Sequence, residues 1–310
     1  MTEHIVDSVL PVRLDRYLRR IIPSLSQGVI EQNLRKGKIK VNGKKALSSL
    51  RVSSGDKILI ESRLVSERAE EQEQSKPFSL NAIKLAEKIQ NEYLLFECEY
   101  FMVIDKPAKL STQGGSKINL SIDDALRYLN FKNKTQLKLV HRLDKETSGI
   151  LLIAKDYYSA NKLGYAFKQR LIKKTYLAIV SGSMRKDVGE ISCQITKSRA
   201  GTYDKVEVDL VNGKLAVTHY KVVKKLKNAC LVEFIPLTGR THQLRVHAQM
   251  LGCPIIGDTK YGIKISSLQE ENNMFLHAAQ IIIPAEIFGK EFKFEAEMPE
   301  YFKKFIEAKT

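Results

Sequence analysis

The chain has 310 residues, of which 43% are hydrophobic, so it can bury a sizeable core and is long enough for about two domains. Its 51 Lys and Arg exceed its 35 Asp and Glu by 16, which favours a polyanionic partner, either nucleic acid or an anionic membrane surface. No run of about 18 apolar residues is present, and the first ten residues carry two acids and no cation, so we expect neither a membrane span nor a signal peptide.

Cysteine usage indicates a reducing compartment. The four cysteines are far apart and show neither the paired spacing of a zinc site nor the pattern of a disulfide framework (Cys98, Cys193, Cys230 and Cys253). We therefore expect a cytoplasmic protein without a structural metal site.

Residues 11–61 are predicted to form a compact, basic α/β module. Helical and strand periods alternate along it and are separated by proline, glycine and an Asn-Gly turn. We expect a helix over 14–21 ended by Pro23, a helix from the N-cap Ser26 to the stop at Gly37, and strands over 39–41 and 57–60 with a hairpin turn at Asn42-Gly43.

The cations of this module gather at the end of the second helix and on the hairpin. A run of charge is most often a solvated face, but these positions are contiguous and suit a surface that follows phosphates. The module resembles the small RNA-binding domain first seen in the small-subunit ribosomal protein S4, on Arg13-Leu14-Asp15, the segment 37–43 and Gly55-Asp56. The RNA-binding candidates are Arg35, Lys36, Lys38, Lys40 and Lys44.

Residues 62–90 separate this module from the rest of the chain. The segment 66–76 is polar and charged and lacks an apolar period, so we expect a mobile linker. Ile83, Ala86 and Ile89 lie at helical spacing and suggest a short added helix.

Residues 91–308 are predicted to form a larger domain in which helices and strands are mixed. A helix should end before Gly252 and Pro254, with Leu244, His247, Ala248 and Leu251 on its apolar face. Arg245 lies off that face and is free to reach elsewhere. We expect strands over 94–97, 101–104, 173–180 (with in–out alternation) and several within 190–235, and helices over 123–130 and 159–168.

The segment 140–149 stands out chemically. It lies between two apolar runs that we interpret as buried strands, and loops carried on a sheet commonly hold catalytic groups. Its carboxylate, Asp144, is flanked by Arg142 and Lys145, whose charge favours the ionised form, so Asp144 is suited to act as a nucleophile or a base. The plainer interpretation is a turn or a helix cap, because Asp-x-x-Thr is a common spacing for both.

His242 and His247 offer a second possible site. They are five residues apart with no acid between them, unlike the pair on a zinc-binding helix, so a metal site is weakly supported. A satisfied or solvent-edge histidine is the favoured interpretation for each. Tyr176, in a predicted strand, is likewise core unless its face lines the pocket that holds Asp144.

Four segments, in this order, resemble the ribosomal large-subunit type of pseudouridine synthases. They are the signature around Asp144 (141–149), a tyrosine strand (173–178), an arginine helix (239–247) and a trailing loop (257–262). The resemblance covers about residues 93–300. It implies an α+β protein, with a small N-terminal α/β S4-like RNA-binding domain (11–61), a linker (62–90), and a pseudouridine synthase catalytic domain (91–308) on a mixed, mostly antiparallel central sheet whose middle is crossed by the active cleft.

The same resemblance implies the reaction and the roles of four residues. The chain would isomerise specific uridines to pseudouridine in large-subunit (23S) ribosomal RNA as a monomer, without metal, cofactor or energy source. Asp144 would be the nucleophile, Arg245 would pair with it, and Tyr176 would stack on the flipped uracil. Arg142 would fill the gap left by that base or hold a phosphate. Whether Asp144 attacks the sugar, attacks the base or first deprotonates the sugar stays open.

Other functions explain part of the chain. A ribosome-assembly factor that only binds RNA would account for the charge and the first module, but not for the acid, tyrosine and arginine segments together. A hydrolase using His242 and His247 would lack a nucleophile elbow and a metal set. Among synthases, the alternative is an enzyme acting on other large-subunit uridines or on transfer RNA.

Overall fold

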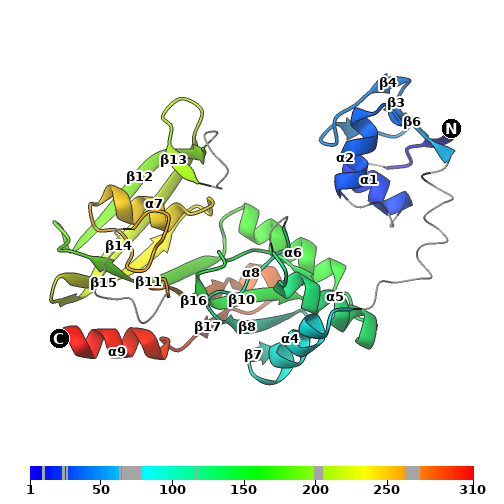
Figure 1. Cartoon of the computed structure of the whole chain (residues 1–310). Helices are drawn as coiled ribbons and strands as arrows, with labels where there is room; N and C mark the ends of the chain where they lie inside the picture. The colour runs from blue at the N-terminus through cyan, green and yellow to red at the C-terminus, as the bar shows by residue number, and fades with distance from the viewer. Residues whose placement is uncertain are drawn as a thin grey trace. The chain divides into compact units, whose positions relative to one another are not determined.

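The computed structural model divides into two compact units, Met1–Pro77 and Phe78–Thr310 (Figure 1). The expectations for Pro23, for Ser26 and for the charged segment 66–76 lie outside the residues that the structure describes. Those residues are 1–8, 11–22, 25, 27–62, 64, 78–115, 118–198, 205–262 and 273–310.

The first unit is a small sheet with two helices packed on it. Helices α1 and α2 and the sheet share one core of buried aliphatic side chains, among them Leu18, Ile30 and Ile58. Asn42 and Gly43 both adopt positive φ, 50° and 75°, as a two-residue type I′ hairpin turn requires. The predicted helices, strands and turn are thus confirmed. The elements are α1 (Leu14–Ile21), α2 (Gln27–Arg35), the sheet β1 (Thr2–Ile5), β6 (Lys57–Ile60), β3 (Ile39–Val41), β4 (Lys44–Lys45), and the pair β2 (Val12–Arg13) and β5 (Arg51–Val52).

The second unit is built on an 11-stranded sheet. Strands β10 and β16 pair in parallel, and the other strand pairs in the described ranges are antiparallel, so the predicted mixed, mostly antiparallel sheet is confirmed. The order is β13 (Val206–Val208), β12 (Val188–Lys197), β14 (Lys214–Leu226), β15 (Ala229–Pro236), β11 (Lys173–Ser181), β16 (Leu276–Ile283), β10 (Ser148–Ala154), β8 (Phe101–Lys106) and β7 (Leu94–Glu97), with β17 (Phe292–Glu295) on β16 and β9 (Lys138–Leu139) on β10.

Helices cover both faces of β8 and β10. Helices α4 (Leu80–Asn91) and α5 (Ile122–Asn133) pack on the face that carries Ile104 and Leu151, and α6 (Tyr157–Lys168) and α8 (Ala285–Phe288) on the face that carries Val103 and Leu152. Strands buried on both faces read as continuous apolar runs, which is why 101–104 and 150–154 were recognisable in the sequence. Helix α4 confirms the added helix expected around Ile83.

The apolar run before Asp144 is not the buried strand that we expected. Its strand, β9, has two residues, and Leu139 is only half-buried. The reason lies in β10, one edge of which is shared between two partners: β9 pairs with Ile153 and Ala154, and β16 pairs with Ser148 and Gly149. The chain therefore has to leave the sheet after Leu139, and this departure forms the loop that carries Asp144.

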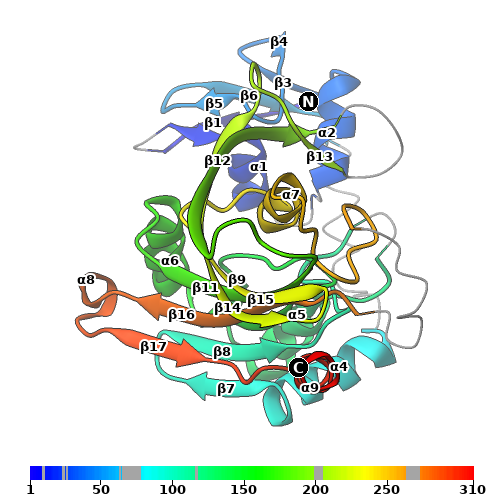
Figure 2. The same cartoon turned by 90° about the vertical axis from the view of Figure 1, so that its left-hand side faces the viewer.

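One periodicity prediction fails, because the strand concerned is buried on both faces. Consecutive residues 178–180 of β11 are fully buried, so in–out alternation is absent there, because successive side chains of a strand point to opposite faces. Helix α7 (Gln243–Met250) has buried side chains at all six positions from Gln243 to Ala248. Strands β12 and β14 curve around it (Figure 2). Arg245 lies off the predicted apolar face and reaches away from the helix, where it is buried against Asp258 and Tyr261.

The remaining helix, α9 (Glu300–Lys309), adds Phe302 and Phe305 to the core lined by β11 and β15. Within the described ranges, no helix is long and apolar enough to cross a membrane.

Candidate active site

A pocket of about 520 Å³ opens over the middle strands of the larger sheet. Its lining comes from the loop before β10, from the end of α6, from β11 and from the segment 236–245 that leads into α7. The structure thus brings together four residues that the sequence singled out: Arg142, Asp144, Tyr176 and Arg245. The five RNA-binding candidates of the basic module belong to the other unit.

Hydrogen bonds from distant residues hold the backbone in place on both sides of Asp144. The Thr112 hydroxyl donates to the Leu143 carbonyl at 2.8 Å and accepts from the Leu143 N–H at 3.2 Å. Lys106, fully buried, donates from Nζ to the Lys145 carbonyl at 3.4 Å and also to two carbonyls of its own loop. A loop held at the residues before and after a carboxylate keeps that carboxylate in one place, as precise chemistry requires.

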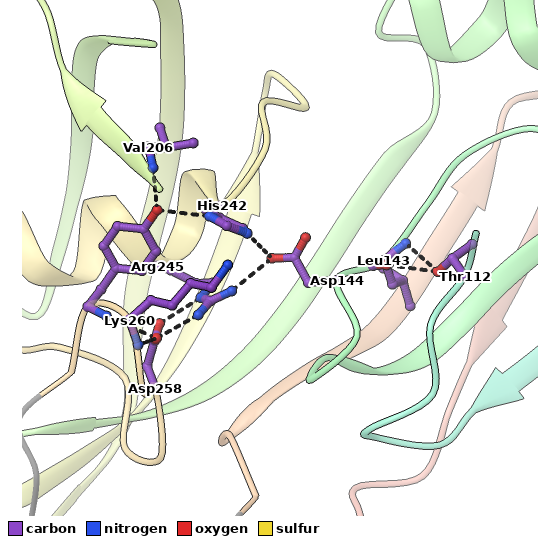
Figure 3. A network of polar contacts seen from close by, with 9 residues as sticks. Thr112, Leu143, Asp144, Val206, His242, Arg245, Asp258 and Lys260 are labelled. Atoms are coloured by element: carbon purple, nitrogen blue, oxygen red, sulfur yellow. Dashed lines mark hydrogen bonds and ion pairs between the residues drawn. The ribbon is translucent and has the colours of Figure 1, made fainter. Parts of the chain in front are cut away.

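Arg245 bridges two carboxylates. Its Nε and Nη2 donate to the two oxygens of Asp258 at 2.7 and 2.6 Å, and its Nη1 donates to Oδ2 of Asp144 at 3.4 Å (Figure 3). The Arg245 side chain is 4% exposed and that of Asp144 is 20% exposed. Asp258 is therefore the buried anchor that aims the guanidinium, and Asp144 is the partner that stays open to the pocket.

The environment of Asp258 keeps it ionised. Burial by itself raises the pKa of Asp258, but hydrogen bonds and charge from Arg245, together with the backbone N–H groups of Lys260 and Tyr261, outweigh burial and lower the pKa below its usual value. One buried guanidinium thus contacts both carboxylates.

His242 completes the contacts of Asp144. Its Nε2 lies 3.7 Å from Oδ2 of Asp144, the same oxygen that Arg245 contacts (Figure 3). Its Nδ1 lies 2.8 Å from the hydroxyl oxygen of Tyr261, which also accepts from the Val206 N–H at 2.7 Å. His247, one turn on, is satisfied by Thr218 and Cys193, as expected for a structural histidine.

Burial shifts the pKa of two further groups in the pocket. Burial and the charge of Asp144 raise the pKa of Tyr176, so its phenol is protonated at neutral pH. Burial lowers the pKa of Lys174, which lines the pocket two residues before Tyr176. Its backbone pairs with Ile281 of β16, but its side chain has no hydrogen bond or ion pair with another described residue. With Arg142, Lys168 and Arg170 also in the lining, the pocket suits a substrate that carries phosphates.

The basic surface of the first unit consists of the end of α2, strand β3 and strand β4. Arg35, Lys36 and Lys44 are exposed, whereas Lys38 pairs with Glu61 at 2.7 Å. Lys40 lies directly opposite Lys45 across β3 and β4. Like charges in that position are destabilising, and a bound anion would remove the repulsion.

Several residues of the site had no role in the sequence analysis. Asp258 lies in the trailing loop that was singled out as a motif, but the sequence did not indicate that its carboxylate pairs with Arg245. His242 was interpreted as a structural histidine, and Lys106, Thr112 and Lys174 were not singled out. Lys174, His242 and Asp258 lie inside segments that carry the family resemblance, but only long-range contacts assign them a part in the site, and no local pattern marks Lys106 or Thr112.

Comparisons with known proteins agree with this arrangement. Residues 100–250 match the family model described as RNA pseudouridylate synthase, and residues 12–58 match the S4 domain. A relative from Rickettsia felis named "Ribosomal large subunit pseudouridine synthase C" is 52% identical over 98% of this chain and 99% of its own. The protein of that name from Escherichia coli is 32% identical over 95% of this chain and 92% of its own. The solved structure of Human RNA Pseudouridylate Synthase Domain Containing 4 matches with a TM-score of 0.60 and 30% identity, and covers 72% of this chain and 94% of that chain.

Proposed function

This chain belongs to the RNA pseudouridylate synthase family, and from that premise we propose that it isomerises specific uridines of large-subunit (23S) ribosomal RNA to pseudouridine. In this reaction the C1′–N1 glycosidic bond breaks, the base turns, and a C1′–C5 bond forms. The C5 proton leaves and N1 gains a proton, so the composition of the RNA is unchanged. The observation that carries the proposal is a carboxylate, Asp144, held at one oxygen by a buried arginine and open to a pocket of nucleotide size.

Asp144 is the catalytic carboxylate in this proposal. It acts at the junction of sugar and base, where a carboxylate can form a covalent intermediate or take a proton. Arg245 holds it in place through the hydrogen bond from Nη1 to Oδ2. Tyr176 stacks on the extruded uracil. The raised pKa of Tyr176 keeps its phenol protonated.

The target uridine leaves its helix to reach this pocket. Flipping a base costs a few kcal/mol, which phosphate contacts can offset. Arg142 is exposed beside Asp144, where it can fill the gap in the RNA or hold a phosphate. Arg35, Lys36, Lys38, Lys40 and Lys44 provide sequence-independent affinity from the S4-like domain. A monomeric state and a cytoplasmic location stay predictions from the sequence.

The direct test is incubation of the purified chain with 23S ribosomal RNA, followed by chemical labelling of pseudouridine and primer extension. We expect new stops at a small number of uridines, and loss of the same stops in RNA from a strain that lacks the gene. Labelling of transfer RNA in place of 23S RNA would support the alternative substrate, and no new pseudouridine in either would contradict the proposal.

A further inference from the structure

His242 lies between Asp144 and Tyr261, and its two ring nitrogens face different partners. Nδ1 faces the Tyr261 hydroxyl at 2.8 Å, and Nε2 faces Oδ2 of Asp144 at 3.7 Å. The hydroxyl in turn accepts from the Val206 backbone N–H at 2.7 Å. The ring therefore sits at the end of a chain of contacts that begins at a fixed backbone amide.

These contacts decide which ring nitrogen carries the proton. The Tyr261 side chain is buried, its oxygen already accepts from Val206, and Nδ1 of His242 is the acceptor within hydrogen-bond distance among the described residues. The hydroxyl therefore donates to Nδ1, and the N–H of the neutral ring is on Nε2. In the opposite tautomer the buried hydroxyl proton of Tyr261 would have no acceptor, and a lone pair of Nε2 would face the lone pairs of Asp144.

The ring is also neutral. Its side chain is 8% exposed, and burial lowers the pKa of His242 to about 4. At neutral pH, Asp144 therefore faces one cation, Arg245, and one neutral donor. A second cation would stabilise the free carboxylate further and make it less reactive.

We propose that His242 is a positioning residue that donates a neutral Nε2–H hydrogen bond to Oδ2 of Asp144 and, together with Arg245, leaves Oδ1 as the reacting oxygen. Both contacts, at 3.4 Å from Arg245 and 3.7 Å from His242, reach Oδ2 (Figure 3). No described side chain has a hydrogen bond or ion pair to Oδ1. The Nε2 contact is longer than a hydrogen bond and tightens when substrate binds, as catalytic contacts often do. The role of His242 in catalysis rests on the proposed function, whereas the assignment of its tautomer does not.

The backbone of His242 supports a role beyond starting the helix. His242 is the N-cap of α7, yet its side chain makes no capping hydrogen bond. Its φ of 54° is in the left-handed region, which asparagine tolerates better than histidine. An asparagine would therefore suit the backbone, but its side chain is too short to reach Asp144 as Nε2 does.

The first test needs no RNA. In the full chain labelled with 15N-histidine at pH 7.5, the His242 signals, assigned by their loss in His242→Gln, should show a protonated Nε2 and an unprotonated Nδ1. Tyr261→Phe should remove this preference. A protonated Nδ1, or a doubly protonated ring, would overturn the proposal whatever reaction the enzyme catalyses.

The second test separates positioning from folding. His242→Asn should keep the melting temperature while kcat falls by about tenfold or more and KM changes little, as expected for the loss of a hydrogen bond to a charged group. His242→Gln, whose amide reaches the position of Nε2, should recover most of kcat. His247→Gln, a buried control on the same helix outside the pocket lining, should leave kcat unchanged. Full kcat in His242→Asn would contradict the proposal, and no activity in the unmodified protein would instead contradict the proposed function.

Discussion

Asp144 is the only acid among the described residues that line the pocket, and the rest of its charged lining is cationic. A substitution of Asp144 should therefore affect the chemical step without affecting RNA binding. We expect Asp144→Asn to keep the fold and the affinity for RNA while product formation falls by at least about a thousandfold, because the carboxylate that we propose to act is lost and the cations remain. The measurements are pseudouridine formation under single-turnover conditions, RNA binding at fixed salt and the melting temperature.

Glu146→Gln is the matched control for Asp144→Asn. Glu146 is a carboxylate of the same loop but is not part of the pocket lining, so its variant should keep activity within a few-fold. Equal losses in both variants would show that the loop needs negative charge in general, and measurable product from clean Asp144→Asn protein would end the assignment of Asp144.

Four histidines, two of them buried (His247 and His277) and two half-buried (His141 and His242), make stability depend on pH. Burial lowers the pKa of His141 to about 3 and the pKa values of His242, His247 and His277 to about 4. In the unfolded chain these groups titrate near 6.5, so between pH 6.5 and about 4 the unfolded state binds more protons. The free energy of unfolding should therefore be highest above pH 6.5 and fall as the pH drops toward 4, by up to about 1.4 kcal/mol per pH unit for each histidine.

Urea unfolding of the full chain at pH 7.5, 6 and 5 measures this dependence. His247→Gln removes one of the four groups without touching the pocket, so it should lower the slope of stability against pH by about a quarter. A slope that is unchanged in this variant, or stability that does not fall below pH 6.5, would contradict the role of these histidines.

At the scale of elements, the start of β10 is packed tightly against β16 near the site. Gly149 has φ +106°, and a Cβ built on it would lie 2.3 Å from the Ala278 carbonyl oxygen of β16. Gly149→Ala would force apart the parallel pair that begins where the Asp144 loop ends. We expect a loss of at least about 3 kcal/mol in the free energy of unfolding, and loss of activity with it.

Gly164→Ala, within α6, is the opposite case. Beyond the adjoining residues and backbone of its own helix, no atom lies within 4 Å of its Cβ position, and alanine is the better helix former, so stability should rise by about 0.5–1 kcal/mol with activity unchanged. Urea midpoints of both variants check the pair. A Gly149→Ala protein as stable as the parent would mean that β10 and β16 can separate without cost.

For the whole molecule, the basic surface of the first unit should determine how RNA affinity depends on salt. We expect neutralising Lys36, Lys38 and Lys44 together with glutamine to weaken RNA binding and lower the slope of log affinity against log salt by about two, since each phosphate contact contributes about 0.9 and Lys38 is already paired with Glu61. Turnover at saturating RNA should change little, because no group of the pocket is altered.

A triple variant with the same loss of charge is the control. Lys88, Lys293 and Lys303 each pair with a glutamate in the larger unit, so replacing them with glutamine should leave the salt slope nearly intact. Equal slopes for the two triple variants would show that net charge, and not the S4-like surface, sets the dependence on salt.

The sequence by itself determined the elements whose signals are local. Helical spacing over 14–21 and the Asn42-Gly43 turn predicted their structures correctly, and doubly buried strands were visible as unbroken apolar runs. The same local patterns, matched to a family, singled out Asp144, Tyr176 and Arg245. Periodicity failed at residues 178–180, because side chains enclosed on every side no longer alternate between core and solvent. For the same reason α7 is buried at positions beyond its predicted apolar face.

Only the tertiary structure decided the contacts between distant segments. Asp144 and Arg245 are 101 residues apart, and nothing along the chain states that Asp258 anchors the guanidinium or that Tyr261 orients His242. The length of β9 was likewise set by competition with β16 for one edge of β10. The physical reason is the same in each case: hydrogen bonds and ion pairs depend on distance in space, whereas periodicity records only neighbours along the chain.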